Sequence, residues 1–349
     1  MLLALTILLF VLIFGAIIVI HEAGHFFVAR WEGMRVKEFA FGFPPRIKSI
    51  KRGGTQFSFN AVPLGGYVSI LGEEEESDAA DSFGKKSPWA RLRVVLAGIT
   101  MNFLLAWVLL TVYFWVAPFG PKVDAIAIAS VRSGSAAEQA GIKVNDFIVA
   151  ANGEALESES DLSEFTKAHA GQTVSFDVRR NGGTETISVT LGTDAAAPLG
   201  VAIADVGEAP VVPWYLAPWY ALQEIWFTVV ATLTFIGSFV AKLFGGGQGV
   251  SVDAVSGPVG IFAMLQQILM LGVPAVIRFS ALISLAVGIF NLLPFPALDG
   301  GRAAFLLVEG FFGKRAISHR SEALIHALGF VLLILLILVV TYYDIRKLS

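Results

Sequence analysis

Cysteine is absent from the sequence, so disulfides, thiol nucleophiles and thiolate metal ligands are all excluded. Charged residues are scarce at 15%, whereas they make up about a quarter of a typical soluble chain. There are only five histidines, and a net charge of −3 gives no basic excess that would indicate a nucleic-acid partner. Apolar residues, in contrast, account for 55% of the 349 positions and give a mean hydropathy of +0.71. This composition indicates a membrane protein.

Four apolar runs are long enough to cross a bilayer, which takes about 20 residues of helix. They lie at residues 1–20, 94–116, 273–293 and 323–342. The first run lacks the basic start and the small-residue cleavage site of a signal peptide, so we expect it to remain as a helix of the protein.

Two further apolar stretches are ambiguous. Residues 214–244 contain Glu224 and Lys242 and are rich in Trp and Tyr, as interfacial segments are. Residues 259–271 are too short to span a bilayer. We expect both stretches to lie in the membrane interface or to dip into it. The alternative is that one of them crosses, which would change the number of spans.

Basic residues predict the orientation. Lys and Arg are concentrated between the first two spans and again between the last two, which places both loops in the cytoplasm. The segment at about 117–209 then lies outside. Arg346 and Lys347, near a C-terminus that is also predicted outside, weakly oppose this orientation.

The outside segment has the pattern of a small α+β domain. Its predicted elements are a strand at 123–131, a helix at 161–168 and a hairpin formed by 173–180 and 184–191. This order, together with the phrase SAAEQAGIKVNDFIVAANG, resembles a PDZ domain of the bacterial protease-associated kind. A PDZ domain typically binds an extended peptide at a sheet edge. A spacer that only filters access by its bulk is an alternative of equal weight.

The principal chemical motif is His21-Glu22-Ala23-Gly24-His25, at the end of the first apolar run. Positions i and i+4 share a helix face, so both imidazoles can reach one tetrahedral Zn²⁺. Glu22 lies beside them and can act as the general base. Ionisable groups at the end of a span are costly and usually functional. The alternative is a polar helix end near the membrane surface.

A catalytic zinc needs three protein ligands, and the best candidate for the third is Asp299. It follows an apolar run on a stretch broken by Pro294 and Pro296. Broken backbone at membrane depth persists only where protein or a water-filled cavity satisfies its polar groups. Asp299 as the N-cap of the next segment is an alternative compatible with ligation. Glu309 and Asp253 are weaker candidates.

The two motifs together resemble the site-2 protease family of intramembrane zinc metalloproteases. HExxH ends the first span, and N-x-x-P-x-x-x-x-D-G runs from Asn291 to Gly300. The PDZ-like insertion matches the bacterial branch, of the regulator of sigma-E protease type. The likeness covers nearly the whole chain, including Val62–Val68, Gly98 with Asn102, and Ser256–Ile261. The chain departs from the family at Ile99, where Pro is common, and in having one outside domain where some relatives have two.

The resemblance implies one Zn²⁺ per chain, held by His21, His25 and Asp299, with Glu22 as the catalytic base. It also implies that Asn102 and the region from Asn291 to Pro294 handle substrate near the metal. For the asparagines, packing between helices is an equal alternative. The implied location is the bacterial cytoplasmic (inner) membrane, with the PDZ-like domain on the extracytoplasmic side.

A hairpin is predicted from 56–62 and 66–71, on the cytoplasmic side, around Pro63-Leu64-Gly65-Gly66. A transmembrane substrate helix hides its amides in internal hydrogen bonds, so it must unwind before it can be cut. The hairpin can pair with the unwound strand by β-augmentation, which makes Gly65 and Gly66 candidate substrate-binding residues. A folded loop without a substrate role is the alternative.

The predicted fold is a polytopic α-helical membrane protein of about four transmembrane helices, with an inserted α+β PDZ-like domain and a membrane-associated β-hairpin. Residues 1–117 and 210–349 form the two halves of the protease core, and 118–209 form the inserted domain. The predicted function is zinc endopeptidase action within or near the transmembrane segments of single-span membrane proteins, such as anti-sigma factors or signal-peptide remnants.

The expected partners are those substrates, membrane lipid and a peptide ligand of the PDZ-like domain, without nucleic acid. A metal or ion transporter is one alternative, since buried His and Asp also line ion paths. The sequence shows no inverted repeats of the kind that transporters have, and a transporter would not explain a glutamate base between two metal ligands. A non-catalytic PDZ scaffold is the other alternative, and the intact Glu22 opposes it.

Overall fold

The structure, a computed structural model, describes residues 2–73, 75, 77–117, 126–132, 134–144, 146–156, 158–180, 183–193, 197–204, 212–243, 256–313 and 319–348. The chain divides into two compact units, each assembled from separate stretches of sequence. The first consists of Met1–Tyr113, Trp214–Phe262 and Ile277–Ser349, and the second of Phe114–Pro213 and Ala263–Val276. The second unit thus takes in a short stretch that the sequence assigned to the membrane core.

Long apolar helices dominate the first unit. They are α1 (Leu2–Trp31), α2 (Pro88–Val116), α5 (Ala217–Leu243), α7 (Val273–Leu292) and α9 (His319–Leu348). Among the described residues, five helices qualify as membrane spans on length and hydropathy, one more than the number predicted. The additional helix is α5. The chain is therefore a polytopic membrane protein.

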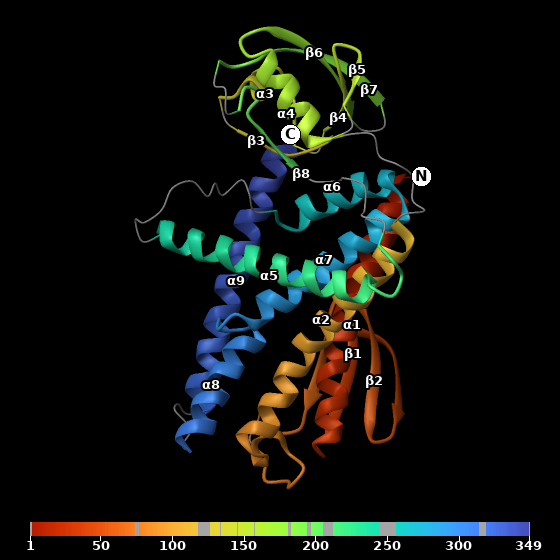
Figure 1. Cartoon of the computed structure of the whole chain (residues 1–349). Coiled ribbons are helices and arrows are strands. Elements are labelled where there is room, and N and C mark those ends of the chain that lie inside the picture. Colours follow the sequence, from red (N-terminus) through yellow and green to blue (C-terminus); the bar gives the residue numbers. More distant parts are fainter. Residues whose placement is uncertain are drawn as a thin grey trace. The chain divides into compact units, whose positions relative to one another are not determined.

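Helix α5 differs from the other long helices in direction and in surroundings. In Figure 1 it runs across the picture, whereas α1, α2 and α9 run from top to bottom. Its Glu224, which is unusual in an apolar stretch, accepts a hydrogen bond of 2.9 Å from Nε of Arg278 on α7. This hydrogen bond to Arg278 explains how a charged residue such as Glu224 is accommodated in an apolar helix.

Helix α2 begins before the start predicted at residue 94. Ser87 Oγ accepts a hydrogen bond of 3.2 Å from the backbone N–H of Ala90, and Pro88 fills the first helical position, where its missing N–H costs nothing. The early turns contain Arg91, which is buried and forms a 2.5 Å ion pair with Glu309 of α8 (Asp299–Phe312). Hydropathy alone cannot recognise a charge that is neutralised across helices.

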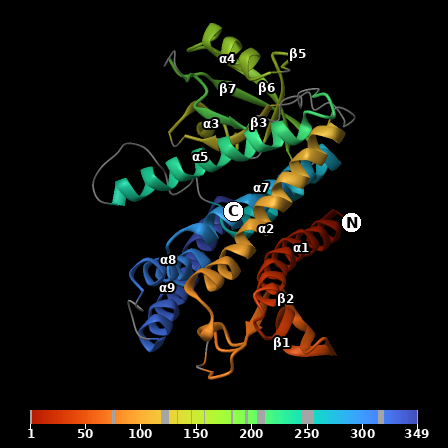
Figure 2. The same ribbon diagram turned by 60° about the horizontal axis from the view of Figure 1, so that its bottom comes forward.

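Two bent strands, β1 (Val36–Arg52) and β2 (Thr55–Ile70), form the sheet of the first unit. The segment 36–41 lies in the middle of the sheet, paired with 56–59 on one side and with 66–70 on the other. The predicted hairpin between 56–62 and 66–71 is therefore wrong, because these segments pair with the strand before them and not with each other. Both views show the sheet beside the C-terminal end of α1 (Figures 1 and 2).

The short helix α6 (Pro258–Ile268) matches the prediction that 259–271 is too short to span. Its N-terminus is tied to the end of α9 by Asp344, whose buried carboxylate accepts hydrogen bonds from the backbone N–H groups of Gly257 (3.2 Å) and Gly260 (2.8 Å). This contact gives the glycines of the Ser256–Ile261 motif a packing role, since a Cβ at either one would press on the Asp344 carboxylate.

The second unit is built on an antiparallel sheet of order β7-β6-β4-β3-β8, with β5 paired to β4. Its elements are β3 (Ile126–Val131), α3 (Ala136–Gln139), β4 (Phe147–Ala151), β5 (Glu154–Ala155), α4 (Glu159–Ala168), β6 (Thr173–Arg180), β7 (Gly183–Thr190) and β8 (Val201–Ala204). Helix α4 starts at a capping box formed by Ser158 and Asp161. The predicted α+β elements are present, and the sequence missed β5 and the edge strand β8.

Candidate active site

Helices α1 and α2 cross at close range where the HExxH motif lies. A Cβ on Gly24 would lie 2.5 Å from the carbonyl oxygen of Ala97, and a Cβ on Gly98 would lie 2.3 Å from Nε2 of His25. Neither position has room for a side chain. Glycine at both positions therefore allows α2 to pack directly on the face of α1 that carries His21 and His25.

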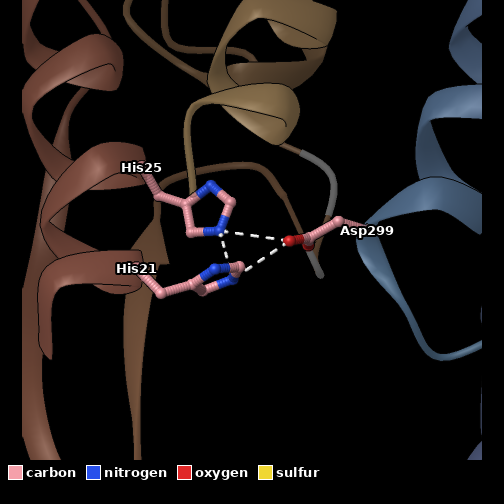
Figure 3. A group of neighbouring side chains, drawn as sticks. All are labelled: His21, His25 and Asp299. Atoms are coloured by element: carbon pink, nitrogen blue, oxygen red, sulfur yellow. Dashed lines mark hydrogen bonds and ion pairs between the residues drawn. The ribbon is translucent and has the colours of Figure 1, made fainter. Parts of the chain in front are cut away.

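The structure brings together the three predicted ligands, from α1 and from the start of α8 (Figure 3). Oδ2 of Asp299 lies 3.1 Å from Nε2 of His21 and 3.4 Å from Nε2 of His25. The two Nε2 atoms lie 3.1 Å apart. In the described part of the chain, no other group of three His, Asp or Glu side chains meets in this way.

The hydrogen bonds behind the imidazoles determine which nitrogen faces the cluster. Nδ1 of His25 lies 2.8 Å from the carbonyl oxygen of Val94, so it carries the proton and leaves a lone pair on Nε2. Nδ1 of His21 lies 3.2 Å from the side-chain amide of Asn102. The amide oxygen of Asn102 is buried without a partner, and a 180° rotation of the amide lets it accept the Nδ1 proton.

This arrangement fits a zinc ion. Ligand atoms bound about 2.1 Å from a tetrahedral zinc lie about 3.4 Å from one another, which matches the spacing of the three atoms. Oδ2 of Asp299 is buried without a hydrogen-bond partner and faces two nitrogen lone pairs, so a cation would satisfy all three. Burial opposes ionisation of Asp299, but the neighbouring His21 and His25 outweigh it and lower the pKa of the carboxyl below its ordinary value.

Asp299 occupies the first turn of α8, where its carboxylate also faces the positive end of the helix dipole. The N-cap is Leu298, so the alternative that Asp299 is the N-cap is wrong. The two glycines that follow let the preceding loop fold tightly over the helix. A Cβ on Gly300 would lie 2.2 Å from the carbonyl oxygen of Leu293, and a Cβ on Gly301 would lie 2.4 Å from that of Phe295.

Glu22 is half-buried on α1, close enough to the three clustered side chains to interact with them electrostatically. Strand β2 passes directly beside it. A Cβ on Gly66 would lie 3.4 Å from Cγ of Glu22, so Gly66 brings the backbone of the strand against the catalytic motif. Gly65 has a φ of +117°, which kinks the strand just before this contact.

The other predicted substrate residues lie apart from the cluster or behind it. Asn102 is fully buried and contacts His21. The amide of Asn291 donates a hydrogen bond of 3.0 Å to the carbonyl oxygen of Val287 on its own helix, and Pro294 is exposed. Of the weaker ligand candidates, Glu309 is paired with Arg91, and Asp253 lies outside the described residues.

Sequence reasoning missed one ion pair at the edge of the site. Arg302, on the first turn of α8, contacts Glu73 just after β2 at 2.5 Å. Glu73 belongs to an acidic stretch with the composition of a solvated loop, and nothing in the spacing of the two residues indicates that they meet. The pair ties the helix that begins with Asp299 to the end of the strand that passes Glu22.

Comparison with known proteins identifies the family. A family model described as peptidase family M50 matches residues 9–336. The chain belongs to peptidase family M50. Its relatives include the regulator of sigma-W protease RasP of Bacillus subtilis (strain 168), which is 29% identical, with 98% of this chain and 99% of the relative covered. Zinc metalloproteases RasP of Geobacillus kaustophilus (strain HTA426) and Shouchella clausii (strain KSM-K16) are 28% and 29% identical, each with 98% of this chain covered.

Membership of family M50 confirms the resemblance to site-2 proteases. This M50 chain is an intramembrane zinc metalloprotease, and neither the transporter nor the scaffold alternative is favoured. The relatives are covered to 98% or 99% of their length, so the likeness extends over whole proteins.

Proposed function

We propose that this M50 protease cuts peptide bonds within or near the transmembrane segments of single-span membrane proteins, using one zinc ion held by His21, His25 and Asp299. The observation that carries the proposal is the convergence of Nε2, Nε2 and Oδ2 within 3.4 Å of one another at the buried end of an apolar helix. Charged and polar groups are expensive there, and a bound cation accounts for all three.

Glu22 is the general base of the proposed mechanism. When bound, zinc would supply Lewis-acid polarisation of the scissile carbonyl. Glu22 would take the proton of the attacking water and deliver it to the leaving amide nitrogen. Its half-buried position beside the ligands, with Gly66 leaving its flank uncovered by a side chain, supports this role.

The segment 66–70 of β2 is the proposed docking strand for the substrate. One side pairs with 36–41, and no strand in the described part of the chain pairs with the other side. An unwound substrate can add its own backbone to such an edge. Because Gly66 lies against Glu22, a strand added there would lead the scissile bond toward the base.

The roles of the asparagines and of Pro294 follow from their surroundings. Asn102 supports His21, since its buried amide has that imidazole as its partner. Asn291 and Pro294 remain substrate-handling candidates on the strength of the resemblance. Pro294 is exposed in the loop before Asp299 and can contact a substrate directly. The side-chain amide of Asn291 must first break its hydrogen bond to the carbonyl oxygen of Val287.

The proposed substrates are membrane-bound anti-sigma factors and signal-peptide remnants in a bacterial cytoplasmic membrane. The printed name of the Bacillus subtilis relative, regulator of sigma-W protease, supports the first class. The proposed arrangement has 118–209 outside as the PDZ-like domain, between two core halves, 1–117 and 210–349, and the distribution of Lys and Arg supports it. Exposed Trp214 and Trp219 and the transverse direction of α5 support an interfacial position for that helix (Figure 1).

The test uses the purified full-length protein and a single-span model substrate, with the products sequenced to locate the cut. We expect cleavage inside or beside the transmembrane segment, loss of cleavage with a chelator, and loss of cleavage in Glu22→Gln with zinc retained. Glu154→Gln, the same change at an exposed residue of the second unit, is the matched control. Cleavage that persists in Glu22→Gln would exclude the proposed base.

The ligand set is tested separately by zinc content. Asp299→Ala should lose both zinc and activity, as should His25→Ala. Stoichiometric zinc and full activity in Asp299→Ala would refute the third ligand.

A further inference from the structure

The loop that carries Asp299 is bonded to a histidine outside the metal cluster. The backbone N–H of Ala297 donates a hydrogen bond of 2.9 Å to Nδ1 of His326 on α9. Ala297 has a φ of +79°, a conformation that residues with a Cβ rarely adopt. It lies two positions before Asp299. Such a conformation persists only where the surroundings enforce it.

A close backbone approach accompanies the hydrogen bond. A Cβ on Gly329 would lie 2.5 Å from both Cβ and the carbonyl oxygen of Pro296. His326 and Gly329 are three residues apart, so they share one face of α9. This face therefore both contacts the loop and bonds to it. Gly301, in the first turn of α8, approaches Phe295 of the same loop.

The chemistry of the ring suits a fixed acceptor. Because Nδ1 accepts the Ala297 N–H, it carries no proton, and the proton of the neutral ring lies on Nε2. Nε2 is buried without a hydrogen-bond partner, and His326 does not belong to the metal cluster. The hydrogen bond from Ala297 is thus the interaction of His326 that requires an imidazole nitrogen.

We propose that His326 is a positioning residue for Asp299. By accepting the Ala297 N–H, it holds the loop in the conformation that directs Oδ2 of Asp299 toward Nε2 of His21 and Nε2 of His25. Residues outside a metal's ligand shell that orient its ligands alter metal affinity without touching the ion. The inference rests on the proposed zinc ligation by Asp299.

The test compares three substitutions at one position in the full-length protein. His326→Asn keeps an acceptor where Nδ1 lies, His326→Gln moves the polar group farther out, and His326→Leu removes it. The readouts are zinc affinity by competition with a chromophoric chelator, and the d–d absorption bands of the Co²⁺-loaded protein. We expect about 10-fold weaker zinc binding and altered bands in His326→Leu and His326→Gln, with both readouts near wild type in His326→Asn.

The proposal is overturned if His326→Leu binds zinc as tightly as wild type with unchanged Co²⁺ bands, or if His326→Asn loses as much affinity as His326→Leu. If His326→Leu fails to fold, Gly329→Ala takes its place, because its Cβ would press on Pro296 from the same face of α9. Gly329→Ala should then weaken zinc binding and alter the Co²⁺ bands. Wild-type values for both readouts in Gly329→Ala would overturn the proposal. Asp299→Ala distinguishes a failure of the proposed ligand set from a failure of the positioning role of His326. If it binds zinc like wild type, the proposed ligand set itself fails, whereas a defect there with none in the His326 variants refutes only the positioning role.

Discussion

The proposed metal centre is built in two different ways. His21, Glu22 and His25 project from little more than one turn of a regular helix, so helix geometry alone places the two imidazoles on one face with Glu22 beside them. Asp299 comes from the end of an irregular loop, and its position depends on Gly300, Gly301 and His326. The helical half is positioned by local structure and the other half by contacts between distant segments.

The two halves of the site should therefore differ in how well they tolerate substitutions. On the helical side, the two imidazoles are placed by the backbone of α1 and crowded by α2, so a Cβ added at Gly98 meets both of them. On the loop side, the backbone can shift at the cost of its supporting contacts. We therefore expect substitutions that crowd the imidazoles to have all-or-none effects, and those in the loop or behind a single ligand to have graded effects.

The largest effect is expected from Gly98→Ala, which adds a Cβ 2.3 Å from Nε2 of His25 and 2.8 Å from Cε1 of His21. Both imidazoles would be displaced, so activity should fall to that of the chelated enzyme and zinc should be lost. Gly237→Ala on α5, where a Cβ meets nothing within 4 Å, is the matched control. Zinc content and cleavage rate measure the outcome, and normal zinc in Gly98→Ala would contradict the described helix crossing.

A smaller effect is expected from Gly301→Ala on the loop side. Its Cβ would lie 2.4 Å from the carbonyl oxygen of Phe295, so the loop must move and Asp299 with it. Zinc affinity should fall about 10- to 100-fold, with two imidazoles still available. A loss as complete as that in Gly98→Ala would remove the distinction between the two halves.

The smallest effect is expected from Asn102, which supports His21 without contributing a ligand. Asn102→Leu should weaken zinc binding about 10-fold, whereas Asn102→Asp keeps an acceptor for Nδ1 and should stay near wild type. Chelator competition measures both. Asp and Leu variants with equal affinity would show that the residue only fills space.

The sequence predicted the elements of the second unit and the three residues that cluster at the site better than it predicted the sheet of the first unit. The turn residues between 173–180 and 184–191 and the helical pattern at 161–168 each extend over a few residues, so local sequence was enough to predict these elements. The central segment 36–41 was missed because its two neighbours lie later in the chain and because Pro44-Pro45 interrupts the alternating pattern. The start of α2 was placed too late because the partner of Arg91 is on α8.

The sequence by itself determined that the chain lies largely in a membrane, that it has no thiol chemistry, and that His21 and His25 share a helix face. Apolar runs, residue composition and i, i+4 spacing can all be read from the sequence without knowing how distant segments pack. Family resemblance and a broken apolar stretch pointed to Asp299. Only the tertiary structure decided that Asn102 lies behind His21, that Gly66 lies against Glu22, and that His326 holds the loop before Asp299. These contacts join segments that are far apart in the chain, and their geometry depends on how closely the backbones pack.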